Sequence, residues 1–226
     1  ANREKPVARD YLKKALVHAG KRKPEVEATV QRMLADIATH RDEAIRRYAR
    51  DLDQWTGDFK VSNETMAAVK RALPVSFKED FAFCLKQVTE FARRQKDSLQ
   101  AFETEISPGV LLGQKLIPVN SVGCYIPGGK YPLISAAIMS VGTAKVAGVG
   151  HIVACAPPRN ADGMYPQTLY AMVESGADEV FVLGGVQALA AMAHGCLGMP
   201  EADMITGPGN AFVAEAKRQL FGTTGI

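Results

Sequence analysis

The sequence predicts an α/β protein in which a parallel sheet with flanking helices follows a mainly helical segment. Two observations lead to this fold class. Glycine is concentrated in the second half, since 16 of the 20 glycines lie after residue 122. That half also alternates short β-rich runs with longer helical patterns, which is typical of strands joined by right-handed helical crossovers. We therefore expect a mainly helical part, residues 1–122, and a sheet-containing part, residues 123–226.

Composition places the chain among globular proteins. It is 47% hydrophobic and 23% charged, which argues against a disordered chain or a disulfide-stapled miniprotein. No apolar run reaches the roughly 18–20 residues of a membrane span, and the charged start does not resemble a secretion signal. A formal net charge of +3 does not indicate a nucleic acid partner. The four cysteines form no CxxC pair, so we expect reduced thiols in a soluble, cytoplasmic protein.

The first part of the chain carries helical patterns. Apolar residues recur at three- and four-residue spacing from Val26 to Ile37, and a second helix is expected to start near Asp42 and to stop at Gly57. Residues 74–79 resemble a capping box. An amphipathic stripe follows, made of Phe81, Cys84, Leu85, Val88 and Phe91. These stripes predict core faces, although a partner surface would have the same pattern. Residues 102–119 predict turns and short strands.

Four strands are expected in the second part, and each is followed by a glycine or proline turn and a helix. The strands cover residues 122–126, 151–155, 179–183 and 203–206. The helices cover roughly residues 134–146, 167–175, 187–194 and 210–220. In a parallel sheet all four turns lie along one edge, where ligands of open α/β sheets bind. Three turns contain glycine, which lets the backbone approach a ligand, and each precedes a helix N-terminus that favours anions. One such turn alone is uninformative, but together they predict a binding site.

Familiar nucleotide and metal motifs are absent. No GxGxxG opens the first strand–helix unit, and residues 124–131 lack the first glycine of a P-loop and end in Tyr131 instead of Ser or Thr. A kinase or ATPase is therefore not favoured. His194 and Cys196 have no second pair of ligands at suitable spacing, so no metal ligand is assigned in this chain.

Four segments, taken in order and spacing, resemble the histidinol dehydrogenase family. They are residues 122–129, 143–149, 184–191 and 207–218. The resemblance implies an incomplete Rossmann-like domain at residues 123–226, inserted into a domain that residues 1–122 begin and later sequence completes. It also implies NAD-dependent oxidation of a primary alcohol, through a bound aldehyde, to a carboxylate. Two NAD molecules would act in turn, in a homodimer whose zinc ion holds the substrate.

Carried over residue by residue, the family's NAD contacts fall on Tyr125, Gln187 and Asn210. All three stand at or just after the C-terminal end of an expected strand, in line with the site predicted from the turns. Without the resemblance, Gln187 and Asn210 would be interpreted as ordinary polar residues at helix starts. Further backbone contacts would come from Gly128, Gly129, Gly207 and Gly209. The family's zinc ligands, its Glu-His acid–base pair and its substrate-contacting serine lie beyond the last matching motif, so no catalytic residue is assigned here.

The substrate stays open between two alcohols. Residues 130–137 differ from the usual segment of the biosynthetic enzymes, which make histidine from L-histidinol. Residues 54–59, 94–98 and 123–125 look more like the family's paralogues, which oxidise sulfonated diols such as 2,3-dihydroxypropane-1-sulfonate. Two other classes remain: a non-catalytic nucleotide-binding module would share the glycine turns, whereas a structural interaction protein would give no reason for their convergence.

Overall fold

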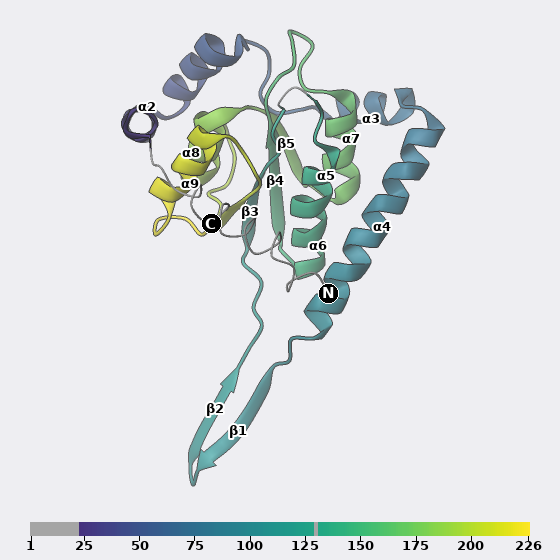
Figure 1. Ribbon diagram of the computed structural model, residues 1–226, viewed down its shortest axis with the longest axis vertical. Coiled ribbons are helices and arrows are strands. Elements are labelled where there is room, and N and C mark those ends of the chain that lie inside the picture. Colours follow the sequence, from purple (N-terminus) through teal and green to yellow (C-terminus); the bar gives the residue numbers. More distant parts are fainter. Residues whose placement is uncertain (1–22, 129–130) are drawn as a thin grey trace, which may run out of the picture.

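The centre of the molecule is a four-stranded parallel sheet in the order β5-β4-β3-β6, seen in a computed structural model that describes residues 23–128 and 131–226 (Figure 1). The strands are β3 (Ser121–Tyr125), β4 (His151–Ala156), β5 (Glu179–Val182) and β6 (Met204–Thr206). Parallel pairing joins β3 to both β4 and β6. The expected fold class is confirmed, and each strand lies within one residue of its expected bounds.

Burial on both faces explains the composition of the sheet. From their second residue on, β3, β4 and β5 are buried throughout, which is why they are continuous apolar runs without polar alternation. Cys124 and Cys155 belong to these strands, and both thiols are free and buried. Burial raises the pKa of Cys124 to about 12 and also raises that of Cys155, so both act as small apolar core residues.

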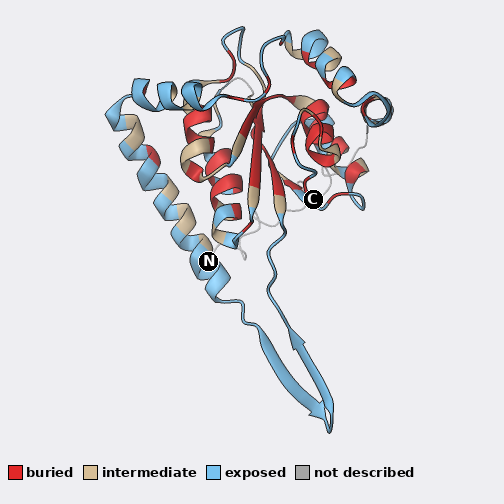
Figure 2. Ribbon diagram, turned by 180° about the vertical axis from the view of Figure 1, so that it is seen from behind, coloured by how far each residue is buried: buried red, intermediate tan, exposed pale blue. Residues whose placement is uncertain are grey.

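Helices cover both faces of the sheet (Figures 1 and 2). One face carries α5 (Ile134–Ala137), the π-helical turn η1 (Ile138–Gly142), α6 (Thr143–Ala147) and α7 (Pro166–Ser175). The other face carries α8 (Gly185–His194) and α9 (Ala211–Leu220). The helix α8 is buried from Val186 to Ala193, because α2 and α9 pack on it in addition to the sheet, whereas α9 buries only one face. The expected helices are confirmed, except that the first contains a π-helical turn that the sequence pattern did not indicate.

The helix α2 (Pro24–Asp53) consists of two helical segments, because Arg41 interrupts it with a φ of 48°. The break confirms the expected start near Asp42. The Asp42 carboxylate does not cap its own helix, however; it accepts the N–H of Leu197 at 2.8 Å, beyond the end of α8. The predicted stop at Gly57 is wrong, since the helix ends at Asp53 and Gln54 adopts a left-handed conformation that closes it.

Two further helices differ from expectation. The sequence pattern missed α3 (Asn63–Ala72), whose Ser62 cap accepts the Thr65 N–H at 3.1 Å. The capping box predicted within residues 74–79 is wrong, because α4 (Val75–Asp97) already begins at Val75 with Pro74 as its N-cap. On α4 only Phe81 of the predicted stripe is fully buried, whereas Phe91 is 67% exposed. The apolar stripe of α4 is therefore only partly a core face.

The strands β1 (Phe102–Ser107) and β2 (Val110–Gln114) form an antiparallel hairpin that projects away from the body of the molecule (Figures 1 and 2). The short strands expected within residues 102–119 are thus confirmed. Every residue of both strands is exposed. Elsewhere, among the helices of the described ranges, none is long and apolar enough to cross a bilayer.

Replacing Gly207 by alanine should destabilise the protein by about 3 kcal/mol or more, because a Cβ there would lie 2.0 Å from the backbone oxygen of Tyr125 at a φ of +118°. The matched control is Gly198→Ala, where φ is +78° but nothing lies within 4 Å, so that only about 1–2 kcal/mol of backbone strain is expected. Urea denaturation of both variants measures the difference. Equal losses would contradict the close packing of β3 against the turn after β6.

Candidate functional site

The turns after the four strands converge at one edge of the sheet. Pro157, in the turn after β4, lies between its neighbours: a Cβ added at Gly128 would be 2.5 Å from its Cγ, and one at Gly184 would be 2.6 Å from its Cβ. Gly207, after β6, packs on the backbone of Tyr125 at the end of β3. The expected convergence is confirmed, and glycine leaves room for the Pro157 ring at Gly128 and Gly184 and for the Tyr125 backbone at Gly207.

The order of the strands changes direction at β3. The chain moves from β3 through β4 to β5 on one side, and β6 then returns to pair on the other side of β3. Ligands of open α/β sheets bind at such a change of direction. Lys217 of α9 holds the turn after β6, since its ammonium group donates to the Gly207 carbonyl oxygen at 2.9 Å. Burial lowers the pKa of Lys217.

Tyr125, the last residue of β3, is 5% exposed. Its hydroxyl oxygen accepts the N–H of Gly185 at 3.2 Å, and burial raises its pKa. Tyr125 therefore connects the end of β3 to the turn after β5. The sequence argument expected the N–H groups at the start of α8 to be free for a ligand. The N–H of Gly185 is not free, because it is already hydrogen-bonded to Tyr125.

Gln187, in the first turn of α8, is 1% exposed. Its Nε2 donates to the Asp53 Oδ2 at 2.8 Å, whereas its Oε1 is buried with no hydrogen-bond partner in the described part of the chain. A buried acceptor without a partner is costly, so such groups call for a functional explanation. Gln187 is the polar side chain at this edge whose hydrogen bonding is incomplete.

Asp53 is a site residue that the sequence argument missed. It is the last residue of α2, and burial raises its pKa, while hydrogen bonds from Gln187 and the Gly184 backbone lower it. The carboxylate therefore lies at the turn between β5 and α8. No local pattern could reveal this, because Asp53 and Gln187 are separated by 134 residues in the sequence.

Asn210 precedes α9 and serves as its N-cap. The side-chain Oδ1 accepts the N–H groups of Phe212 at 3.0 Å and Val213 at 3.1 Å, which satisfies two groups at the start of the helix. The residue itself is exposed, and its amide nitrogen makes no hydrogen bond among the described residues. The structure thus joins Tyr125 and Gln187 through the Gly184 and Gly185 turn, and it places Asn210 after the neighbouring strand without a direct contact to them.

Part of the expected site lies outside the described residues. Gly129, expected as a backbone contact, and Lys130, which begins the segment that differs from biosynthetic enzymes, both fall outside the described ranges. Across residues 23–128 and 131–226, no three His, Cys, Asp or Glu side chains come together as metal ligands do. These residues therefore do not fit a zinc ion.

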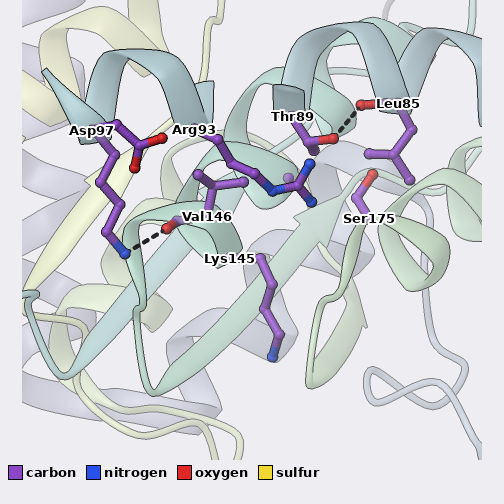
Figure 3. Close-up of a pocket in the computed structure, with 9 residues that line it drawn as sticks. Leu85, Thr89, Arg93, Asp97, Lys145, Val146 and Ser175 are labelled. Atoms are coloured by element: carbon purple, nitrogen blue, oxygen red, sulfur yellow. Dashed lines mark hydrogen bonds between the residues drawn. The ribbon is translucent and has the colours of Figure 1, made fainter. Parts of the chain in front are cut away.

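A separate hollow of about 550 Å³ lies between α4, α6 and α7 (Figure 3). Its cations already have partners: Arg93 pairs with Glu90, and Lys145 lies 3.7 Å from Asp178. Lys96 donates to the Val146 carbonyl oxygen at 3.0 Å. Because these charges are compensated within the chain, and because the hollow lies away from the carboxyl ends of the strands, we assign no ligand to it.

Known proteins resemble this chain over nearly its whole length. The sequence model described as histidinol dehydrogenase matches residues 17–226. Sulfopropanediol 3-dehydrogenase of Ruegeria pomeroyi is 46% identical over 217 residues, which cover 96% of this chain and 50% of that protein. Histidinol dehydrogenase of Lactiplantibacillus plantarum is 37% identical over 203 residues, which cover 89% of this chain and 47% of that protein.

A solved structure agrees with the sequence comparison. The crystal structure of histidinol dehydrogenase from Elizabethkingia anophelis matches with a TM-score of 0.83 at 27% identity, over 91% of this chain and 47% of that one. The chain spans about half the length of the curated relatives it matches. Since the family model covers residues 17–226 and the fold agrees with the solved structure, this chain belongs to the histidinol dehydrogenase family.

Proposed function

We propose that this chain forms the nucleotide-binding part of an NAD-dependent alcohol dehydrogenase, which oxidises a primary alcohol through an aldehyde to a carboxylate. The observation that carries the proposal is the convergence of the glycine turns around Tyr125 and Gln187, at the carboxyl edge of a parallel sheet. Membership of a family of dehydrogenases supports it. NAD, when bound, supplies the hydride acceptor.

The residues at this edge have separate tasks in the proposal. The exposed Asn210 amide donates to an oxygen of the cofactor while its own oxygen keeps capping α9. Gln187 offers the buried Oε1 acceptor, which becomes accessible when the turn at Gly184 adjusts around the ligand. Tyr125 holds that turn through Gly185. The starts of α8 and α9 add positive dipole ends near the cofactor phosphates.

Other parts of the proposal lie outside the described residues. Because no metal cluster fits within them, we place no zinc ligand and no acid–base residue there, and we assign both to the part of the enzyme that corresponds to the other half of its relatives. We further propose a cytoplasmic homodimer. The alternative is a nucleotide-binding module without catalysis, which would bind NAD at the same edge.

A sulfonated diol is the substrate that we favour. The relative named sulfopropanediol 3-dehydrogenase is 46% identical to this chain, and one named histidinol dehydrogenase homolog is 48% identical, whereas two named simply histidinol dehydrogenase are 37% and 38% identical. Residues 54–59 are one of the segments that resemble the paralogues. They begin directly after Asp53, which is a residue of the proposed site. L-Histidinol, the substrate of amino-acid biosynthesis, remains the second candidate.

Replacing Gln187 by alanine should weaken NAD binding by about 2- to 12-fold, which corresponds to the loss of one neutral hydrogen bond worth about 0.5–1.5 kcal/mol. Isothermal titration of the full-length protein with NAD measures the dissociation constant. The matched control is Gln31→Ala on the exposed side of α2, which should bind NAD as the unaltered protein does. Unchanged affinity of the Gln187 variant would remove this residue from the site.

Two substitutions at Asn210 separate its structural task from its proposed cofactor contact. Asn210→Ala removes the helix cap and should cost about 1 kcal/mol of unfolding free energy. Asn210→Asp keeps a capping oxygen but has no amide donor and adds a negative charge, so it should unfold like the unaltered protein yet bind NAD several-fold more weakly. If the Asp variant binds NAD normally, Asn210 is a helix cap only.

The full-length enzyme should oxidise 2,3-dihydroxypropane-1-sulfonate far more efficiently than L-histidinol. A site that pairs a sulfonate with cationic or N–H donors leaves those groups unpaired around an imidazole, which changes specificity by factors of about 10⁴. The absorbance of NADH formed from each alcohol gives the two kcat/KM values. A higher value for histidinol would assign the protein to amino-acid biosynthesis, and turnover of neither alcohol with intact NAD binding would favour the non-catalytic module.

A further inference from the structure

The helical part of the chain reaches the nucleotide edge through one carboxylate, Asp53. In the described residues α2 packs more extensively against α8 than against any other element. The left-handed Gln54 ends α2 immediately after Asp53, and its N–H closes the helix onto the Ala49 and Arg50 carbonyl oxygens. This fixed helix end places the Asp53 side chain beside the first turn of α8.

Three groups of the proposed site surround this carboxylate. Gln187 Nε2 donates to the Asp53 Oδ2 at 2.8 Å, and the Gly184 backbone also hydrogen-bonds to the carboxylate. The Tyr125 hydroxyl lies at the same turn, since it accepts the N–H of Gly185, the residue after Gly184, at 3.2 Å. A Cβ added at Gly184 would lie 3.1 Å from Oδ2, so the turn fits tightly around the carboxylate.

An ionised carboxylate accepts hydrogen bonds but cannot donate them. The Gln187 amide must therefore turn its nitrogen toward Asp53 and its oxygen away. That leaves Oε1 as a buried acceptor with no partner in the described residues. With a neutral or apolar residue at position 53, nothing in these contacts would distinguish the two orientations of the amide. Asp53 thus decides which end of Gln187 is left for a ligand.

We propose that Asp53 is a positioning residue of the nucleotide site, which fixes the orientation of the Gln187 amide and the turn at Gly184. The inference rests on the proposed function, because it concerns the cofactor of that site. It adds that the affinity for the nicotinamide cofactor depends on a residue of the helical part that acts through Gln187 and does not itself contact the cofactor.

A double-mutant cycle in the full-length protein tests this dependence. Asp53→Ala should weaken NAD binding by up to the about 2- to 12-fold expected for Gln187→Ala, because it acts only by releasing the Gln187 amide from its orientation. In the Gln187→Ala background the same substitution should change the dissociation constant by less than about twofold, because the group through which it acts is gone. A side chain that merely stabilised the fold would weaken binding by the same factor in both backgrounds.

A second variant keeps the test decisive if Asp53→Ala folds poorly. Asp53→Asn preserves size and should weaken NAD binding about threefold, since its amide accepts either orientation of Gln187, and it too should lose its effect in the Gln187→Ala background. Asp51→Ala, on the exposed side of the same helix turn, is the matched control and should leave affinity unchanged.

The outcomes separate the inference from the function on which it rests. Normal NAD binding by both Asp53 variants, or equal losses with and without Gln187, overturns the inference while the dehydrogenase proposal stands. Failure of the unaltered protein to bind NAD overturns the proposed function, and the inference falls with it. The positioning role is supported if each Asp53 substitution weakens NAD binding in the otherwise unaltered protein but changes it little in the Gln187→Ala background.

Discussion

The parallel pairing of β3 with both β4 and β6 is the constraint on which the rest of the structure depends. Parallel neighbours cannot be joined by tight turns, so every connection has to cross over as a helix. The crossovers before β5 lie on one face of the sheet, and α8 brings the chain back on the other face to reach the free side of β3. That reversal brings the end of β3 and the turn after β6 together, and the backbone contact at Gly207 leaves no room for a side chain between them.

The helix α8 is held at both ends by α2. At its start, Gln187 binds Asp53, the final residue of α2. Beyond its end, Arg41 donates to the His194 carbonyl oxygen and Asp42 accepts from Leu197, at the break within α2. The segment between the break and Asp53 therefore spans the length of α8. The helical part of the chain thereby supports one side of the proposed nucleotide-binding edge, and the interruption at Arg41 is part of that support.

Sequence patterns predicted helices and strands wherever burial imposes a regular spacing or an unbroken run of apolar residues. They failed where a role depends on contacts between residues far apart in the sequence. The strands and their helices were found because a sheet buried on both faces needs apolar runs separated by glycine turns. The short helix α3 was missed because none of its residues is fully buried and Met66 and Val69 alone pack against the core from it, which is too short an apolar pattern to indicate a helix. The turn rule located the edge at which Tyr125, Gln187 and Asn210 lie, but it could not show that Asp53 holds Gln187 or that Asn210 caps α9. Those roles depend on hydrogen bonds that a linear pattern does not contain.

The projecting hairpin bears on solubility rather than on the nucleotide edge. Each of its strands pairs on one side only, so in the described residues both outer edges keep unpaired backbone N–H and C=O groups. Phe102, Ile106 and Leu112 are among its exposed apolar side chains, and isolated two-stranded hairpins are marginally stable in water. An uncovered hairpin of this kind is a template for strand addition, with the charges of Glu103 and Glu105 opposing it. Self-association of the isolated chain would therefore begin at this arm, and added salt would promote it by screening those charges.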